Sequence, residues 1–296
     1  MLQISRCPLC NESYFNQKVE CTDYLVSNEK FSILECINCG MMFTNPVPEL
    51  NELSKYYHSE NYTSHHLRKY TPAGFVYHTI RRFNIRNKFK LVKTHSQSNR
   101  ILDYGCGTGE FLKYLQNNGF VAKGIEPNEK ARRYAFQYNQ VPVGDLEDFK
   151  TLETKSFGIV TLWHVLEHVY NLSETIMKIR DVLTDDGTLI IAVPNPSSFD
   201  AAHYGHFWAA WDTPRHLYHF TPPVLKKLIT RAGFEPVNFY PMKFDSYYVS
   251  LLSERNMFGK SKIFQAMKTG YRSNKIAGDQ PEKYSSYIAV FRKRRN

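Results

Sequence analysis

The sequence predicts an α/β domain, doubly wound, with a mostly parallel seven-stranded sheet that follows a small cysteine-rich module. From Asn99 onward, short apolar runs alternate with segments of helical periodicity, the pattern of a parallel sheet covered on both faces. Before that point, two C-x-x-C pairs lie in a stretch without long periodic runs. With 296 residues, 42% of them hydrophobic, the chain can form one large core and a small additional module.

Three units are predicted along the chain. The first ends at the helix-incompatible sequence NPVP, and the second is helical, because apolar residues recur there at roughly helical spacing between basic ones. The third unit holds the α/β domain and an insertion after its fifth strand. The predicted bounds are 1–48, 49–97 and 98–296, with the insertion at 196–220.

Each predicted strand of the α/β domain is short and apolar, and the last is expected to run antiparallel to the others. The strands are Ile101–Leu102, Val121–Ile125, Val141–Val143, Phe157–Leu162, Thr188–Val193, Phe234–Tyr240 and Ser286–Phe291. The helices are predicted at Glu110–Asn117, Glu129–Tyr138, Asn171–Leu183 and Pro222–Ala232. Thr221 is the expected N-cap of the last helix, and Gly233 is its expected stop.

A glycine-rich segment, DYGCGTG at residues 103–109, follows the first strand and opens the first helix. Glycines let the backbone turn tightly and approach a ligand closely. Glu126 ends the next strand, where a carboxylate can bind ribose hydroxyls. The spacing is G-x-G-x-G, whereas nicotinamide enzymes use G-x-G-x-x-G, and Asp103 would repel a pyrophosphate. An acid at this place favours a ligand with a positive end, such as the amino group of a methionine moiety.

At these residues the chain resembles the class I S-adenosylmethionine-dependent methyltransferases. The resemblance extends, in order, over Leu102–Gly109, Gly124–Pro127, Gly144–Leu146, Trp163–Val169 and Leu183–Asn195. It implies a fold of the class I methyltransferase type, S-adenosylmethionine as cofactor and methyl transfer as activity. It also implies that Glu126 binds the ribose, the glycine backbone holds the methionine part, and Asp145 and Leu146 contact the adenine. The cofactor-binding residues expected from it are Asp103, Gly105, Cys106, Gly107, Gly109, Glu126, Pro127, Asp145, Leu146 and His164.

The segment WHVLEHV, residues 163–169, is similar to that of quinone-pathway O-methyltransferases, where Glu and His near this place can hold a divalent metal. His164 stands where an acid would help such a site, so the residues do not favour metal-assisted chemistry. Two interpretations of Glu167 and His168 stay open. His168 is a candidate general base, or the pair is buried and anchors the next helix.

The segment 199–220 contains four histidines and two tryptophans, which is unusual for a simple connection. In this fold such an insertion usually shapes the acceptor pocket, where aromatic rings supply stacking surface and a histidine removes a proton. We expect His216 to be the base near the transferred methyl, with Asp212 and Arg215 as its orienting partners. The alternative is a loop held together by its own aromatic packing.

The two cysteine pairs, CPLC and CINC, are separated by 25 residues. Four thiolates at this spacing can bind one tetrahedral zinc, and four protein ligands leave no open position, so a structural zinc ribbon is predicted. Iron in a rubredoxin-like site is the alternative, and Cys21 is expected to be a core thiol. The arrangement resembles sugar C-methyltransferases with an N-terminal zinc-binding domain, and some ribosomal-RNA methyltransferases also carry such a module. The predicted metal ligands are Cys7, Cys10, Cys36 and Cys39.

Charge and hydropathy limit the partners. The formal net charge is +10, and residues 61–100 contain nine Lys or Arg and no acid, which favours an anionic partner or marks a solvated helix face. No apolar run has the length of a membrane span, and no signal-peptide pattern is seen, so a cytoplasmic protein is expected. The sequence leaves the oligomeric state open.

The leading functional hypothesis is methyl transfer to a small or carrier-linked acceptor: a nucleotide sugar, a glycan precursor or a quinone-like phenol. One alternative is an RNA methyltransferase in which the ribbon and residues 61–100 bind phosphates. The other is a non-enzymatic module that binds partners and only senses the cofactor.

Overall fold

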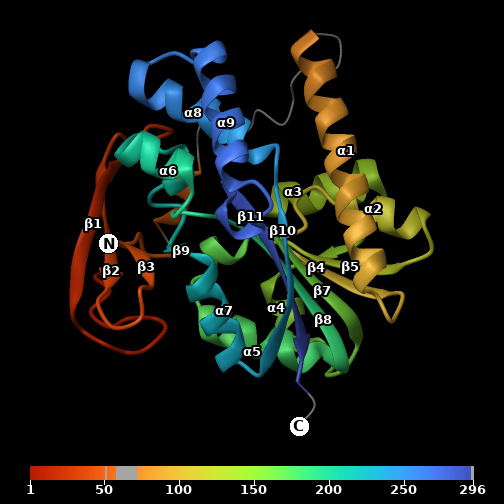
Figure 1. Ribbon diagram of the computed structural model, residues 1–296. Coiled ribbons are helices and arrows are strands. Elements are labelled where there is room, and N and C mark those ends of the chain that lie inside the picture. Colours follow the sequence, from red (N-terminus) through yellow and green to blue (C-terminus); the bar gives the residue numbers. More distant parts are fainter. Residues whose placement is uncertain (51, 58–71, 295–296) are drawn as a thin grey trace.

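The computed structural model describes residues 1–50, 52–57 and 72–294 (Figure 1). Its main sheet has seven strands in the order β10-β11-β8-β7-β4-β5-β6. Strands β4 to β8 are mutually parallel where they pair, and β11 is antiparallel to both of its neighbours, which confirms the predicted sheet. The strands are β4 (Arg100–Tyr104), β5 (Val121–Ile125), β6 (Val143–Gly144), β7 (Phe157–Trp163), β8 (Leu183–Pro194), β10 (Phe234–Pro241) and β11 (Ser286–Lys293).

Two strand predictions were wrong at their boundaries. Strand β8 begins at Leu183, not Thr188, because Leu183 already pairs with Phe157 of β7. Strand β6 is only Val143–Gly144, because the Val141 amide is still hydrogen-bonded to the carbonyl of Ala135 in the preceding helical segment. Neither difference moves the carboxyl ends of β4, β5 and β7, which position the site.

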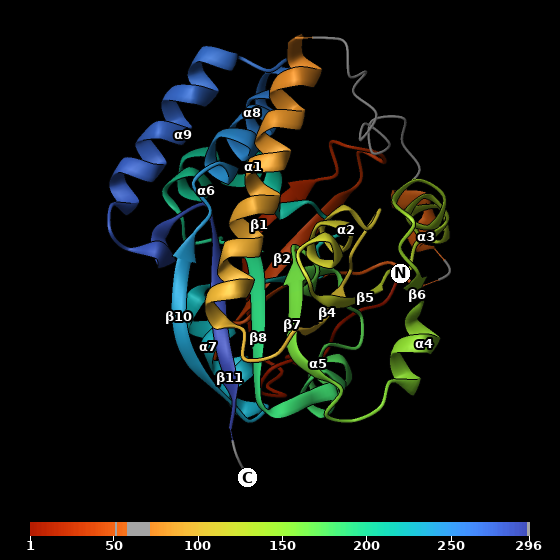
Figure 2. The same ribbon diagram turned by 90° about the vertical axis from the view of Figure 1, so that its right-hand side faces the viewer.

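Helices cover both faces of the sheet (Figure 2). Side chains of α1 (Pro72–His95) and α2 (Glu110–Asn117) pack with Ile101 and Ile159 in one apolar cluster. On the other face, α5 (Leu172–Val182) and α7 (Pro222–Arg231) pack with Leu102 and Val160. The doubly wound arrangement follows from this alternation, since successive residues of a buried strand face opposite layers. The remaining helices of this part are α3 (Glu129–Tyr134), which continues as a π-helix over Ala135–Asn139, and α4 (Leu146–Thr151).

The N-terminal module is a small antiparallel sheet of β1 (Phe15–Thr22), β2 (Lys30–Cys36) and β3 (Met42–Asn45). Its fourth strand, β9 (Tyr218–His219), comes from the aromatic segment 199–220, which is distant in sequence, and pairs with β3. The module and the α/β part therefore share a sheet, and Figure 1 shows β9 leading from that sheet towards α7.

The aromatic segment 199–220 is ordered and mostly buried. It starts with α6 (Phe199–Tyr204) and continues through short 3-10 turns. Tyr204, Trp208 and Trp211 form an apolar cluster with Cys21, Ile33 and Met42 of the N-terminal module. For these rings the structure agrees with the alternative that the segment is held together by aromatic packing. They join the module to the α/β part, and they leave little ring surface on which an acceptor could stack.

Two helices that the sequence did not predict, α8 (Asp245–Phe258) and α9 (Ile263–Ala277), form a hairpin between β10 and β11. Buried polar contacts attach it to α6. Asp200 accepts hydrogen bonds from Trp208 Nε1 (2.8 Å), Ser273 Oγ (2.7 Å) and Ser285 Oγ (2.6 Å). The hairpin is thereby fixed to the same segment that joins the N-terminal module.

The predicted helical region 49–97 is described only in part. It contains the 3-10 turn Leu53–Tyr56 and helix α1, and residues 58–71, which hold part of the basic stretch, lie outside the described residues. Among the residues that the structure describes, no helix is long and apolar enough to cross a bilayer.

Candidate active site

The glycine loop connects β4 to α2 at the carboxyl edge of the sheet. Gly105, Gly107 and Gly109 all have positive φ angles, 78°, 56° and 76°. A Cβ added at Gly105 would lie 2.3 Å from Val165, and one added at Gly109 would lie 2.5 Å from Val141. Valine side chains therefore already occupy the space beside these two glycines. At Gly107 no described atom lies within 4 Å of such a Cβ. The loop is therefore open to a ligand at its middle glycine.

Glu126 lies at the end of β5 and contacts the same loop. Its Oε2 accepts a hydrogen bond from the Gly107 amide, and its Oε1 accepts one from the Asn128 amide, both at 2.9 Å. Burial raises the pKa of Glu126, although these two amides act in the opposite direction. A partly buried carboxylate beside an open glycine fits the hydroxyl groups of a ribose.

Asp103 is 2% exposed at the end of β4 and accepts a hydrogen bond from Thr161 Oγ1 at 2.6 Å. Burial raises its pKa to about 6, while the Thr161 bond and the nearby Lys88 ammonium act in the opposite direction. The carboxylate is thus largely ionised at neutral pH, and it lies where the resemblance implied an acid for the amino end of the cofactor.

Lys88 of α1 is a component of this site that the sequence interpretation missed. Its ammonium lies 4.7 Å from the ring centroid of Trp163 and 5.8 Å from that of Phe111. Burial lowers the pKa of Lys88, and Asp103 and Asp245 oppose that effect. The sequence could have indicated that Lys88 faces the interior, since position 88 lies four residues before Val92, on the face of α1 that contributes Val92 to the core.

His164 follows β7 and bridges two carboxylates. Its Nε2 lies 3.1 Å from Asp245 Oδ2, and its Nδ1 lies 3.5 Å from Glu167 Oε1. Burial lowers the pKa of His164, but Asp245 and Glu167 outweigh it and raise the pKa to about 10. His164 has a positive φ of 56°. The partner Asp245 comes from α8, which no sequence pattern had marked.

Glu167, His168 and His216 form a second polar cluster. One ligand atom of each lies within 4.8 Å of the others, so the three can hold a metal ion. The Nδ1 of His168 donates to the Arg215 carbonyl and that of His216 to the Ala210 carbonyl, both at 2.9 Å. A carbonyl can only accept, so each ring keeps Nε2 as its basic atom. Glu167 is 1% exposed, and neither of its carboxylate oxygens has a hydrogen-bond partner among the described residues.

The structure separates His216 from the base arrangement expected for it. Burial and the neighbouring His168 lower the pKa of His216 to about 4, so its ring is neutral at physiological pH. Asp212 Oδ2 lies 3.9 Å from His216 Nε2, beyond hydrogen-bond distance, whereas Arg215 binds Asp212 Oδ1 at 2.7 Å. Arg215 also binds Asp23 of the N-terminal module at 2.8 Å. Asp212 and Arg215 therefore attach the module to this segment more than they orient His216.

The residues expected at the adenine end lie at the start of α4. Asp145 is the N-cap of that helix, and its Oδ1 accepts hydrogen bonds from the Glu147 and Asp148 amides. These bonds, the Asp148 amide foremost, lower its pKa. Leu146 is 40% exposed and offers an apolar surface. Cys106, within the glycine loop, packs against the apolar cluster of Leu112, Ala135 and Val141, and Pro127 is exposed beyond β5.

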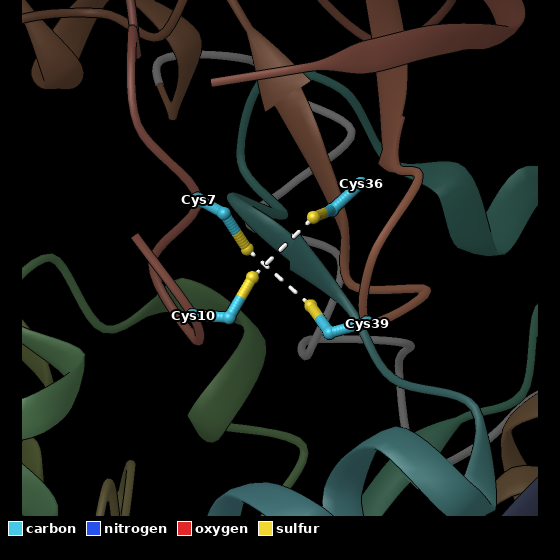
Figure 3. A group of neighbouring side chains, drawn as sticks. All are labelled: Cys7, Cys10, Cys36 and Cys39. Carbon is cyan, nitrogen blue, oxygen red and sulfur yellow. Dashed lines mark hydrogen bonds between the residues drawn. The ribbon is translucent and has the colours of Figure 1, made fainter. Parts of the chain in front are cut away.

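Four cysteines converge in the N-terminal module (Figure 3). The Sγ atoms of Cys7 and Cys39 are 3.5 Å apart, as are those of Cys10 and Cys36. Tetrahedral zinc with Zn–S bonds of about 2.3 Å needs sulfur atoms about 3.8 Å apart, so the donor set fits zinc with a small adjustment. Cys21 lies outside the set, buried in β1.

Each cysteine pair is followed by a residue of positive φ, Asn11 at 64° and Gly40 at 73°. The amides of these residues donate to the Cys7 and Cys36 carbonyls, both at 2.9 Å. Each pair therefore forms a closed knuckle with its thiols directed inward. The sequence showed Gly40 as a turn residue, and Asn11 has the same role.

Several known proteins are similar to parts of this chain. A family model described as "Methyltransferase domain" matches residues 76–238. A ubiquinone biosynthesis O-methyltransferase of Glaesserella parasuis serovar 5 (strain SH0165) is 29% identical over 128 residues, which are 38% of this chain and 54% of that protein. The protein of the same name from Bordetella avium (strain 197N) is 28% identical over 165 residues, 50% of this chain and 67% of that protein. The chain thus spans about half to two thirds of the length of these relatives.

Among solved structures, a SAM-dependent methyltransferase from Archaeoglobus fulgidus matches with a TM-score of 0.51 and 20% sequence identity. The match covers 72% of this chain and 94% of that one. This likeness concerns the fold, and it agrees with the predicted sheet. The cofactor-binding and catalytic roles of the site residues named above stay predictions.

Proposed function

This chain belongs to the methyltransferase domain family, and on that premise we propose that it transfers a methyl group from S-adenosylmethionine to a small or carrier-linked acceptor. The observation that carries the proposal is the open backbone at Gly107 beside the Glu126 carboxylate, at the carboxyl edge of a parallel sheet. Candidate acceptors are a nucleotide sugar, a glycan precursor and a quinone-like phenol. The names of the two curated relatives favour a hydroxyl group as the methylated atom.

The residues at the glycine loop would bind and orient the cofactor. When bound, S-adenosylmethionine supplies an electrophilic methyl on a sulfonium. Glu126 would accept hydrogen bonds from the ribose hydroxyls, and Asp103 would attract the amino group. Leu146 would cover the adenine, while Asp145 acts mainly by fixing the start of α4. Alignment of the methyl and the acceptor for in-line attack supplies most of the rate, since little other chemistry is required.

For removal of the acceptor proton we favour His168 over His216. Both rings have Nδ1 bound to a carbonyl, but His216 is 8% exposed and its pKa is lowered to about 4, which makes it a weak base. His168 is partly exposed, so its Nε2 can reach an acceptor more readily. Glu167 next to it would stabilise the imidazolium that forms. His216, 4.6 Å from His168 between ring centroids, would hold that ring in place.

The N-terminal module would be held by a structural zinc at Cys7, Cys10, Cys36 and Cys39. All ligands are thiolates and come from the two knuckles, which leaves no coordination position for a substrate. We retain the three predicted units, 1–48, 49–97 and 98–296, as a proposal. The pairing of β3 with β9 supports a fixed contact between the first and the last.

Methyl transfer from labelled S-adenosylmethionine to a panel of phenols, nucleotide sugars and RNA tests the function. We expect transfer to a small acceptor, with His168→Ala lowering turnover by roughly 10²–10⁴-fold at unchanged cofactor affinity. The control is His203→Ala, an exposed histidine of the same segment, which should keep full activity. Cofactor binding without transfer to any acceptor would support the sensing module. Full activity of His168→Ala would remove the assignment of the base.

A further inference from the structure

The α8–α9 hairpin exposes large apolar side chains where the two helices meet. Phe264 is 83% exposed, Ile263 66% and Phe258 47%. Further exposed apolar residues lie on the same two helices: Met257, Met267, Tyr271 and Ile276. Figure 1 shows the hairpin at the opposite end of the molecule from the C-terminus. Isolated exposed apolar residues are ordinary, but a cluster of this size marks an interaction surface.

Helix α9 presents an apolar stripe outward. Its buried residues are small, namely Ala266, Thr269, Gly270, Ser273 and Ala277, and a Cβ at Gly270 would lie 2.7 Å from Tyr247 of α8. Small residues let the two helices approach closely, so the large residues occupy the opposite face. Phe264, Met267 and Tyr271 recur there at helical spacing. The large apolar side chains of α9 are therefore exposed, while its buried face is made of small residues.

The tip of the hairpin and helix α9 carry charge of a single sign. From Arg255 to Gly278 the chain contains six Lys or Arg residues and no acid. Lys260 and Lys262 flank the exposed tip, and the Lys262 ammonium lies 3.3 Å from the ring centroid of Phe258. Aromatic and aliphatic side chains bordered by lysines are typical of segments that lie in the headgroup region of a bilayer.

We propose that the tip of this hairpin docks on an anionic membrane surface. The apolar residues around Phe264 would enter the headgroup boundary, and the lysines would contact lipid phosphates and carboxylates. Such cations are attracted to the negative surface potential of an anionic leaflet. The charge decides between occupants, because two copies of the same hairpin would bring like charges together, whereas an anionic bilayer is complementary. The proposed contact is peripheral, because only the tip of the hairpin would meet the bilayer.

Docking would also orient the candidate active site. Asp245 begins α8 and contacts His164 at 3.1 Å, while the tip follows Phe258 at the other end of the same helix. A helix of 14 residues spans about 21 Å. The site would then lie roughly one helix length from the bilayer, within reach of a group extended from a lipid. A lipid-linked acceptor follows if the proposed methyl transfer is correct, whereas the docking itself does not depend on it.

Sedimentation of the full chain with vesicles tests the proposal without any measure of activity. We expect binding to vesicles of phosphatidylcholine mixed with phosphatidylglycerol, and weak binding to phosphatidylcholine alone. Phe264→Gln should weaken binding about tenfold or more, since it removes an aromatic side chain that the docked protein would bury in the bilayer. The matched control is Phe136→Gln, which changes a phenylalanine that is 70% exposed outside the hairpin.

The charge contribution needs its own pair of variants. Lys260→Gln combined with Lys262→Gln should weaken binding to the anionic vesicles, whereas Lys226→Gln combined with Lys227→Gln, an exposed pair on α7, should not. Equal binding of wild type to both vesicle types, or equal effects of the hairpin and control variants, would overturn the proposal. So would a wild-type dimer that Phe264→Gln dissociates, in the absence of vesicle binding, because the occupant would then be a second copy.

Discussion

Replacing Gly107 by alanine separates ligand binding from folding. Gly107 has φ 56° and Gly119 has φ 87°, and an added Cβ meets no described atom within 4 Å at either position. Each alanine therefore costs only the left-handed backbone energy, about 1–2 kcal/mol of the free energy of unfolding. Gly119 lies between α2 and β5, away from the carboxyl edge of the sheet, so Gly119→Ala is a control matched in strain.

We expect the two variants to lose similar stability in denaturant titrations and to differ in cofactor affinity. The methyl group of Gly107→Ala would project into the space that S-adenosylmethionine needs beside Glu126, and affinity should fall at least about tenfold, or 1.4 kcal/mol. Gly119→Ala should bind as wild type does. If calorimetry gave equal affinities for both variants, the open space at Gly107 would not be the ligand position, and the reasoning would be refuted.

Three other outcomes follow from the structure. Wild type should contain about one zinc per chain by elemental analysis, Cys10→Ser should lose it and Cys21→Ser should keep it; metal-free wild type prepared without chelators would contradict the site. The pKa of His164 is raised to about 10 in the folded chain from an ordinary value near 6.5. The stability that wild type has over Asp245→Asn should therefore be full below about pH 6.5 and vanish as pH rises through 10, and a pH-independent difference in denaturation would count against the pair. Arg215→Met should destabilise the fold by about 3–5 kcal/mol, because it leaves the buried Asp23 carboxylate and the partly buried Asp212 carboxylate without their cation, and a loss below 1 kcal/mol in urea titration would show that the ion pairs are unimportant.

Local patterns predicted the α/β part well. Helix α2 spans the predicted residues, Glu110–Asn117, and β5 spans Val121–Ile125. The glycine loop and Glu126 were found because their chemistry follows directly from the strand ends. The cysteine cluster could be predicted in the same way, since C-x-x-C knuckles are local structures.

Contacts between segments that are distant in sequence could not be predicted from local patterns. The pairing of β3 with β9 joins residues that are far apart in sequence, and no spacing rule connects them. Helix α8 escaped prediction because its apolar residues do not follow one clear face. Asp245 and Lys88 therefore appeared as ordinary charged residues, although the fold places both beside the candidate site. Our candidate base moves from His216 to His168 for the same reason, because burial and the neighbouring His168, not residue type, lower the pKa of His216.

Titration calorimetry of the purified wild-type chain with S-adenosylmethionine tests the proposed cofactor binding itself. We predict saturable binding of about one cofactor per chain, weakened in Glu126→Ala by roughly 1.5–3 kcal/mol through loss of charged hydrogen bonds. A well-folded wild type that binds no cofactor, or a Glu126→Ala variant that binds with unchanged affinity, would contradict it.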